Sequence, residues 1–241
     1  MKRKSDDKKF AAKMFFKDAL LKQSRGKVSI YFEVSSNPSQ EALINEIRTL
    51  RKLDHPGIMK LEKLYETMLG IFLIMELLEG GELFEHLKKK RTFTERDCAI
   101  ILMRILDSLL YMHSKNIVHR DIKPENLILR SRADEYGIVI ADFGLAQCLS
   151  ETAVYVKCGS PGYCAPEILN CTDPTITYST KCDVFSVGCV FYHLIVGKNP
   201  FWSKYTKEAY SFNKTGIVSF EDPKIKDFSA SGKNGNKKKP N

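Results

Sequence analysis

The stretch VHRDIKPENL, residues 118–127, carries five ionisable side chains and one amide between two apolar segments. A solvated turn would explain the presence of charge, because charged side chains prefer water. It does not explain this selection, in which a carboxylate (Asp121), an ammonium group (Lys123) and an amide (Asn126) follow one another on one short loop. The stretch is therefore a candidate chemical site.

A further carboxylate follows downstream. In LILRSRADEYGIVIADFGLA, residues 127–146, two short apolar runs flank a polar turn, and Asp142 comes directly before Phe143 and Gly144. This arrangement predicts that two loops face one site.

The residue types suit phosphoryl transfer. Moving a phosphoryl group from a nucleotide to a hydroxyl requires a carboxylate to orient the acceptor, cations to neutralise phosphates, and oxygen ligands for magnesium. Asp121 supplies the carboxylate and Lys123 a mobile cation, while Asn126 and Asp142 offer hard oxygen donors. Asp121 lies five residues before Asn126, which predicts that base and metal ligand are side by side.

Three motifs occur in the order of the protein-kinase signature set, namely HRDIKPEN at 119–126, DFG at 142–144 and APE at 165–167. With these motifs the chain resembles the eukaryotic protein kinases. The resemblance implies that Asp121 is the catalytic base and that Lys123 contacts the transferred phosphate. It also implies that Asn126 and Asp142 hold Mg²⁺.

The resemblance extends toward the N-terminus. FAAK, residues 10–13, is similar to the VAIK strand of the family, which implies that Lys13 contacts the α- and β-phosphates of ATP. The best match for its helix partner is Glu46 in INEIRTL, although the long connection between the two leaves the helix register open. The implied fold is α+β and two-lobed, with a small strand-rich N-lobe and a mainly helical C-lobe. ATP and Mg²⁺ are the implied cofactors.

Further positions match nucleotide-contacting residues of the family. Met75 matches the gatekeeper, and Glu76 to Leu78 would offer hinge backbone to adenine. Glu82 would meet the ribose or a basic residue of the peptide substrate, and Ile128 belongs to the implied nucleotide contacts. Other matches concern the interior: Asp183 as a buried anchor for the catalytic loop, and as the regulatory spine Leu50, Leu61, His119 and Phe143.

Finer features indicate the group. Lys123 after the catalytic aspartate, together with GSPGYCAPE, resembles serine/threonine kinases, and Ser160 would help position the acceptor hydroxyl. LEGGELFEHL, CGSPGYCAPEIL and GKNPFW are most similar to the calcium/calmodulin-dependent kinase group. Protein substrates with Ser or Thr acceptors are the implied partners, whereas calmodulin or another regulator cannot be assigned. Arg120 would receive a phosphate from the segment that contains Ser150 and Thr152.

Hydrophobic periodicity predicts the order of elements. The predicted N-lobe spans residues 1–77, the C-lobe residues 78–228, and a basic disordered tail residues 229–241, with the LEGGEL glycine pair marking a hinge. The predicted elements are a strand from near Lys9, a possible strand KVSIYFEV, a helix with Asn37 as N-cap and Pro56 as stop, strands at 59–66 and 71–77, a helix that opens with Thr94, and a buried helix at 181–197.

Bulk composition narrows the class. The chain has 241 residues and 43% hydrophobic content, enough for a real core. The net charge of +9 comes partly from MKRK and KKKP at the ends, and no base-reading pattern accompanies it, so no nucleic-acid partner is expected. The seven cysteines include no CxxC pair, so we expect them to be reduced thiols. No apolar run is long enough to span a bilayer. We expect a cytoplasmic protein, with nuclear import through the KKKP tail as an alternative.

The departures from the family pattern leave two functions open. No glycine-rich phosphate-covering loop precedes Lys13, and the chain stops soon after FEDPKIKDFS, so we expect the family's last helices to be missing and Glu167 to lack its usual arginine partner. These gaps suggest a fragment. The chain is either a serine/threonine kinase or a kinase-like fragment or pseudokinase that binds nucleotide or partners without turnover.

Overall fold

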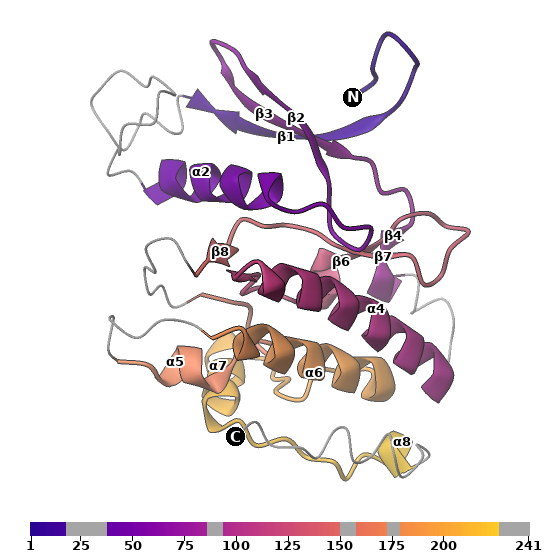
Figure 1. The fold of residues 1–241 in the computed structure, drawn as a ribbon. Helices are drawn as coiled ribbons and strands as arrows, with labels where there is room; N and C mark the ends of the chain where they lie inside the picture. Colours follow the sequence, from indigo (N-terminus) through magenta and orange to yellow (C-terminus); the bar gives the residue numbers. More distant parts are fainter. Residues whose placement is uncertain (18–37, 86–93, 150–157, 173–178, 227–241) are drawn as a thin grey trace.

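The computed structural model describes residues 1–17, 38–85, 94–149, 158–172 and 179–226. Within these ranges the N-terminal part is rich in strands and the C-terminal part is mainly helical, as Figure 1 shows. This confirms the predicted α+β class. The possible strand KVSIYFEV, Asn37 and the tail 229–241 lie outside the described residues.

The N-terminal sheet has three antiparallel strands in the order β1-β3-β2. Its strands are β1 (Phe10–Phe16), β2 (Leu61–Glu66) and β3 (Gly70–Glu76). Helix α2 (Pro38–Arg51) lies between this sheet and the helical part (Figure 1). Leu43 packs with Ile71 and Leu73 in a small core under the sheet, whereas Leu50 joins the larger core below. The apolar stripe of one amphipathic helix thus contacts both parts.

Two predicted boundaries in this region are wrong. α2 ends at Arg51 rather than near Pro56, because Leu53 N–H donates to Leu50 O in a turn that leaves the helix. β2 begins at Leu61 rather than at residue 59, because Met59 N–H donates to Ile140 O of the C-terminal part. A local turn ends the helix early, and a long-range contact delays the start of the strand.

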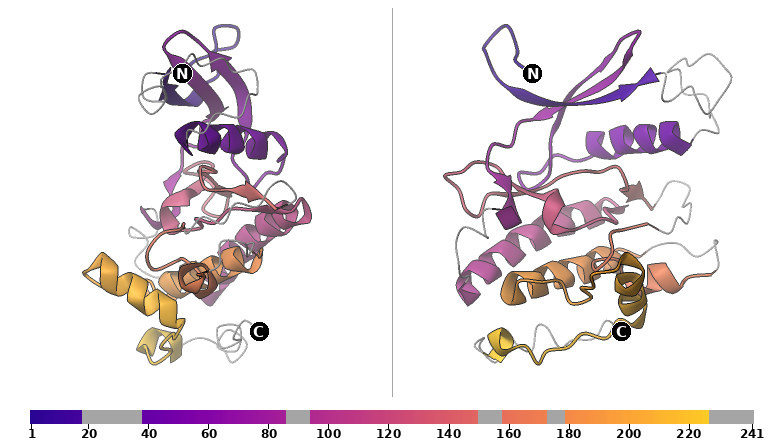
Figure 2. Two further views of the ribbon diagram at one scale, coloured as in Figure 1. Left: turned by 90° about the vertical axis from the view of Figure 1, so that its left-hand side faces the viewer. Right: turned by 180° about the vertical axis from the view of Figure 1, so that it is seen from behind.

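Two long helices build the C-terminal core. α4 (Glu95–Ser114) and α6 (Lys181–Val196) lie alongside each other in Figure 1 and in both views of Figure 2. The predicted start at Thr94 is confirmed as a capping box, since Thr94 Oγ1 accepts from Asp97 N at 3.1 Å and Asp97 Oδ2 accepts from Thr94 N at 3.0 Å. α6 is buried on most of its residues, as predicted, and ends at Gly197 with φ 91°.

Short strands hold the two polar loops next to each other. β4 (Gly81–Glu82), β6 (Leu127–Leu129) and β7 (Ile138–Ile140) form one antiparallel sheet, while β5 (Ile117–Val118) pairs with β8 (Gln147–Cys148). The VHRDIKPENL loop, with the 3₁₀ turn η1 (Pro124–Asn126), connects β5 to β6. The loop with Asp142 connects β7 to β8. Both pairings therefore bring the loops to the same end of the strands.

The predicted hinge glycines allow a close approach of two strands. A Cβ at Gly80 would lie 2.4 Å from Leu129 Cβ and 2.5 Å from Leu129 O, so no side chain fits there. Gly81 has φ 77°, in the left-handed region that glycine tolerates. The division between residues 77 and 78 stays a prediction; Leu50, Leu53 and Ile58 of the first part belong to the main core of the second.

The remaining helices lie beyond α6 (Figure 2). They are α5 (Pro166–Asn170), α7 (Thr206–Thr215) and α8 (Pro223–Lys226). In the parts of the chain that the structure describes, no helix is both long enough and apolar enough to cross a membrane. The seven cysteines are free thiols, and burial raises the pKa of Cys98 and of Cys164 to about 12, so both are neutral at neutral pH.

Candidate active site

A buried carboxylate from α6 holds the first polar loop. Asp183 is fully buried, and its two oxygens accept from His119 N and from Arg120 N, each at 2.8 Å. His113 Nε2 lies 2.9 Å from the same carboxylate. Arg120 has φ 67°, a strained value for a residue with a side chain. Asp183 therefore holds the turn that precedes Asp121, which agrees with the anchoring role that the family resemblance implied for it.

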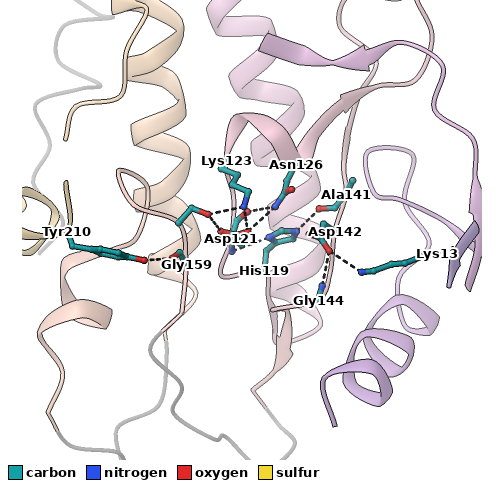
Figure 3. A network of polar contacts seen from close by, with 11 residues as sticks. Lys13, His119, Asp121, Lys123, Asn126, Ala141, Asp142, Gly144, Gly159 and Tyr210 are labelled. Carbon is teal, nitrogen blue, oxygen red and sulfur yellow. Dashed lines mark hydrogen bonds and ion pairs between the residues drawn. The ribbon is translucent and has the colours of Figure 1, made fainter. Parts of the chain in front are cut away.

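His119 is a core residue and not a candidate base. Burial lowers the pKa of its fully enclosed imidazole, which is therefore neutral at neutral pH. Its Nδ1 accepts from Asp121 N at 3.3 Å, and its Nε2 donates to Ala141 O at 3.0 Å. The ring packs edge-on against Phe143 with centroids 4.9 Å apart. His119 thereby ties the two polar loops together (Figure 3).

Three polar side chains converge on Asp121 (Figure 3). Asp121 Oδ1 accepts from Ser160 Oγ at 2.7 Å, and Asp121 Oδ2 lies 2.7 Å from Lys123 Nζ. Lys123 Nζ also donates to Ser160 Oγ at 2.9 Å. Asn126 Nδ2 donates to the backbone O of Asp121 at 2.8 Å and to Oδ2 at 3.2 Å. The base, the cation and the amide predicted from one loop are therefore in direct contact, and Ser160 joins them from the GSPGYC segment (residues 159–164).

The second polar loop lies beside the first, as the sequence predicts. Ala141 N–H donates to Asn126 O at 2.9 Å. This bond joins the two loops at the residue before Asp142. Asp142 has φ 58°, a left-handed conformation that Asp tolerates better than most residues. Phe143 is buried in the main core, where Leu50 also lies and against which Leu61 packs. The matched spine residues are thus grouped in one core region.

Lys13 links the sheet, α2 and the second loop. Its Nζ donates to both oxygens of Glu46, at 2.7 and 2.9 Å, and lies 3.3 Å from Asp142 Oδ1. The helix register that the sequence left open is therefore the one that pairs Lys13 with Glu46. Glu46 is one of the few buried acidic side chains, so its carboxylate depends on this pair for its charge partner.

The charges of Lys13 and Asp142 support each other, whereas burial raises the pKa of Glu46 above its ordinary value despite the hydrogen bonds from Lys13. Burial lowers the pKa of Lys13, but the hydrogen bonds and charges of Glu46 and Asp142 raise it more, so the net pKa lies above its ordinary value. Burial raises the pKa of Asp142, but Lys13 and the Gly144 amide lower it more, so the net pKa lies below its ordinary value. Lys13 is thus an ammonium and Asp142 a carboxylate at neutral pH.

The donor set fits Mg²⁺ held together with phosphates. Mg²⁺ sites of this kind use one or two carboxylates plus phosphate oxygens and waters, rather than a cage of protein ligands. Among the described residues no cluster of three or more His, Cys, Asp or Glu side chains could hold a metal ion. Asp142 is half exposed at 55%, and Asn126, whose Nδ2 faces Asp121, has its amide oxygen as a further hard donor. Both predicted ligands thus have the required chemistry.

The predicted adenine-side residues lie along β3 and the sheet of β4 and β6. Met75 pairs in register with Ala11 of β1, and Glu82 pairs with Ile128. Leu78 is half-buried between the two sheets. The side chain of Glu76 is used elsewhere, since Arg130 Nη1 donates to it and it accepts from Lys60 N at 3.0 Å. The N–H of Glu76 donates to Lys60 O at 3.1 Å, so the predicted nucleotide contact of Glu76 would use its backbone carbonyl.

The residues predicted to carry a phosphate that Arg120 would bind are Ser150 and Thr152, and both lie outside the described residues. Arg120 Nε donates to Leu145 O at 2.6 Å, directly after the DFG motif, so the guanidinium bridges the two loops. Glu167 is exposed on α5.

Sequence reasoning missed several residues that hold the site. Asn45 Nδ2 donates to Ala146 O and ties α2 to the second loop, although the two residues are 101 positions apart. Asn213 and Tyr210 of α7 bond the GSPGYC segment. The sequence offers one local sign of the role of Asn213. It follows Ala209 by four positions, so a polar side chain lies on the buried face of the helix.

Removal of the Asp183 carboxylate tests its anchoring role. We expect Asp183→Ala to lower the free energy of unfolding by about 3 kcal/mol, because it leaves buried donors without an acceptor. Chemical denaturation measures the change. Asp54→Ala is the matched control, since the Asp54 side chain is 85% exposed and its removal should change stability little. Equal stability of the two variants would contradict the anchoring role.

Comparison with known proteins identifies the family of this architecture. The family model described as "Protein kinase domain" matches residues 1–237. The calcium/calmodulin-dependent protein kinase type 1B of Rattus norvegicus is 34% identical over 223 residues, which cover 90% of this chain and 64% of the relative.

Two more relatives show the same pattern. The calcium/calmodulin-dependent protein kinase type 1 of Macrobrachium nipponense is 37% identical, over 80% of this chain and 55% of the relative. Myosin light chain kinase A of Dictyostelium discoideum is 40% identical, over 68% of this chain and 55% of the relative. The chain spans a little more than half the length of these two curated relatives.

Proposed function

This chain belongs to the protein kinase family, and from that premise we propose that it is a serine/threonine kinase that transfers the γ-phosphate of ATP to protein hydroxyls. One observation carries the proposal: Asp121 Oδ1 accepts the hydroxyl hydrogen of Ser160 at 2.7 Å. An acceptor serine or threonine would present the same group to the same oxygen. The three kinases named above support the assignment to this class.

The residues divide the reaction between them. Asp121 orients the acceptor hydroxyl and takes its proton as the oxygen attacks the γ-phosphorus. Lys123, 2.7 Å from that carboxylate, neutralises negative charge on the phosphoryl group in transfer. Lys13, held by Glu46, binds the α- and β-phosphates. Asp142 and Asn126 would hold Mg²⁺, which would neutralise negative charge on the phosphates.

An alternative is a kinase-like module that binds nucleotide without turnover. Both oxygens of Asp121 already have partners, from Ser160 and Lys123, and such a closed arrangement favours a resting site. In a turnover-competent site the acceptor hydroxyl shares Asp121 with Ser160, because each carboxylate oxygen can accept more than one hydrogen bond. The two functions differ in one measurable property, phosphate transfer.

The test is a radiolabelled transfer assay with three peptides that differ only in the acceptor, which is Ser, Thr or Tyr. We expect transfer to the Ser and Thr peptides, little or none to the Tyr peptide, and loss of transfer when EDTA removes Mg²⁺. A peptide with Ala at the acceptor position is the blank. Nucleotide binding without transfer to any peptide would reject the kinase proposal in favour of the alternative.

A further inference from the structure

Side chains of α6 and α7 hold the backbone of the GSPGYC segment. This segment carries Ser160, which contacts both Asp121 and Lys123. Within it, Ser160 O accepts from the N–H groups of Tyr163 and Cys164, each at 3.1 Å, in a tight turn. From α6, Ser186 Oγ donates to Tyr163 O at 2.8 Å. The remaining contacts come from α7.

Asn213 makes the central contact from α7. It is fully buried, its Oδ1 accepts from Gly162 N at 2.6 Å, and its Nδ2 donates to Cys164 O at 3.1 Å. One amide thus satisfies a backbone donor and a backbone acceptor two residues apart. Gly162 has φ 89° and a Cβ there would lie 2.5 Å from Asn199 Nδ2, so this stretch has one tightly packed conformation.

Tyr210 holds the other side of Ser160. Tyr210 lies about one turn of α7 before Asn213. Its hydroxyl donates to Gly159 O at 3.3 Å, as Figure 3 shows. Ser160 therefore lies between two backbone positions, Gly159 and Gly162, that α7 fixes. Since Ser160 has two side-chain bonds into the Asp121 cluster, the position of α7 sets the position of the groups that receive the acceptor.

We propose that Asn213, assisted by Tyr210, is a positioning residue that fixes the GSPGYC segment for binding of the protein substrate. The inference rests on the proposed kinase function and deepens it by assigning α7 to the acceptor side of the site. Among the described residues, the Asn213 side chain bonds Gly162 N and Cys164 O and makes no hydrogen bond with Lys13, Glu46 or Asp142, so its effect should fall on the peptide and not on ATP.

The test compares Asn213→Leu with the parent in the full 241-residue chain. Leucine has the same number and branching of side-chain heavy atoms as asparagine but makes neither hydrogen bond. We expect the KM for a Ser peptide to rise about tenfold, from the loss of two hydrogen bonds, with the KM for ATP unchanged. Hydrogen exchange at the Gly162 amide, followed by mass spectrometry, should become faster, and this readout does not require catalysis.

Asn170→Leu is the matched control. Asn170 Nδ2 donates to Lys214 O at 2.9 Å, so this variant also removes an asparagine bond that involves α7, but at an exposed place away from the GSPGYC segment. It should leave both the peptide KM and the Gly162 exchange as in the parent. If Asn213→Leu does not fold, Tyr210→Phe replaces it, with an expected rise in peptide KM of about threefold.

The outcomes separate this inference from the proposed function. An active parent whose peptide KM and Gly162 exchange are the same in Asn213→Leu would overturn the positioning role. An equal rise in the KM values for peptide and ATP would overturn it too, since this indicates general loosening of the fold. An inactive parent with faster Gly162 exchange in the variant would reject the kinase function while supporting the Asn213 contact.

Discussion

Asp121→Asn is expected to reduce phosphate transfer to a Ser peptide by about a thousandfold while nucleotide binding and stability stay close to those of the parent. The amide has nearly the same shape as the carboxylate. It cannot take the acceptor proton, however, and its NH₂ group would face the donors that now approach Asp121. Single-turnover transfer measurements with saturating ATP would isolate this step from substrate binding.

A matched variant shows whether the effect is specific to Asp121. Asp134 is an exposed aspartate in the turn between β6 and β7, where its Oδ1 accepts from Tyr136 N at 3.0 Å. Asp134→Asn should transfer phosphate at the parent rate. Transfer by Asp121→Asn within a few-fold of the parent would refute the assignment of Asp121 as base.

Asp142→Ala is expected to abolish the Mg²⁺ dependence of ATP binding and to lower transfer by on the order of a thousandfold. Charge neutralisation by a bound metal contributes several kcal/mol to the transition state, and each 1.4 kcal/mol is a factor of ten in rate. The variant also removes one of the two carboxylates that surround Lys13. Calorimetric titration with ATP, with and without Mg²⁺, measures the binding effect.

Asp142→Asn distinguishes loss of charge from backbone strain. Asp142 has φ 58°, which asparagine tolerates and alanine does not. If the carboxylate charge of Asp142 binds Mg²⁺, the asparagine variant should also lose most of the Mg²⁺ dependence, because its amide oxygen is neutral. Parent-like Mg²⁺ dependence in Asp142→Asn would show that alanine acts through the backbone and would refute a requirement for the Asp142 charge.

Local patterns in the sequence predicted the elements well where the stabilising partners are near in the chain. The helix start predicted at Thr94 is one example, because the capping box of α4 joins Thr94 to Asp97, only three residues away. The functional groups of the two loops could also be predicted, because HRDIKPEN and DFG specify which side chains are present. Hydrophobic periodicity and turn chemistry depend on spacing alone, and spacing is printed in the sequence.

The predicted start of β2 failed because a distant contact competes with the local pattern. Met59 looks like part of a strand, but its N–H donates to Ile140 O. These two residues lie 81 positions apart in the sequence. No periodicity within a window of ten or twenty residues contains that information.

By itself, the sequence determined which catalytic groups this chain has, their order, and the amphipathic elements that carry them. Only the tertiary structure decided that Glu46 is the partner of Lys13, 33 residues away, and that Asn213 holds Gly162 from 51 residues away. A hydrogen bond requires a donor–acceptor distance that is correct to within a few tenths of an ångström, and a suitable angle. Those quantities depend on how α2 packs against the sheet and α7 against the GSPGYC segment, and packing is a property of all the core side chains together.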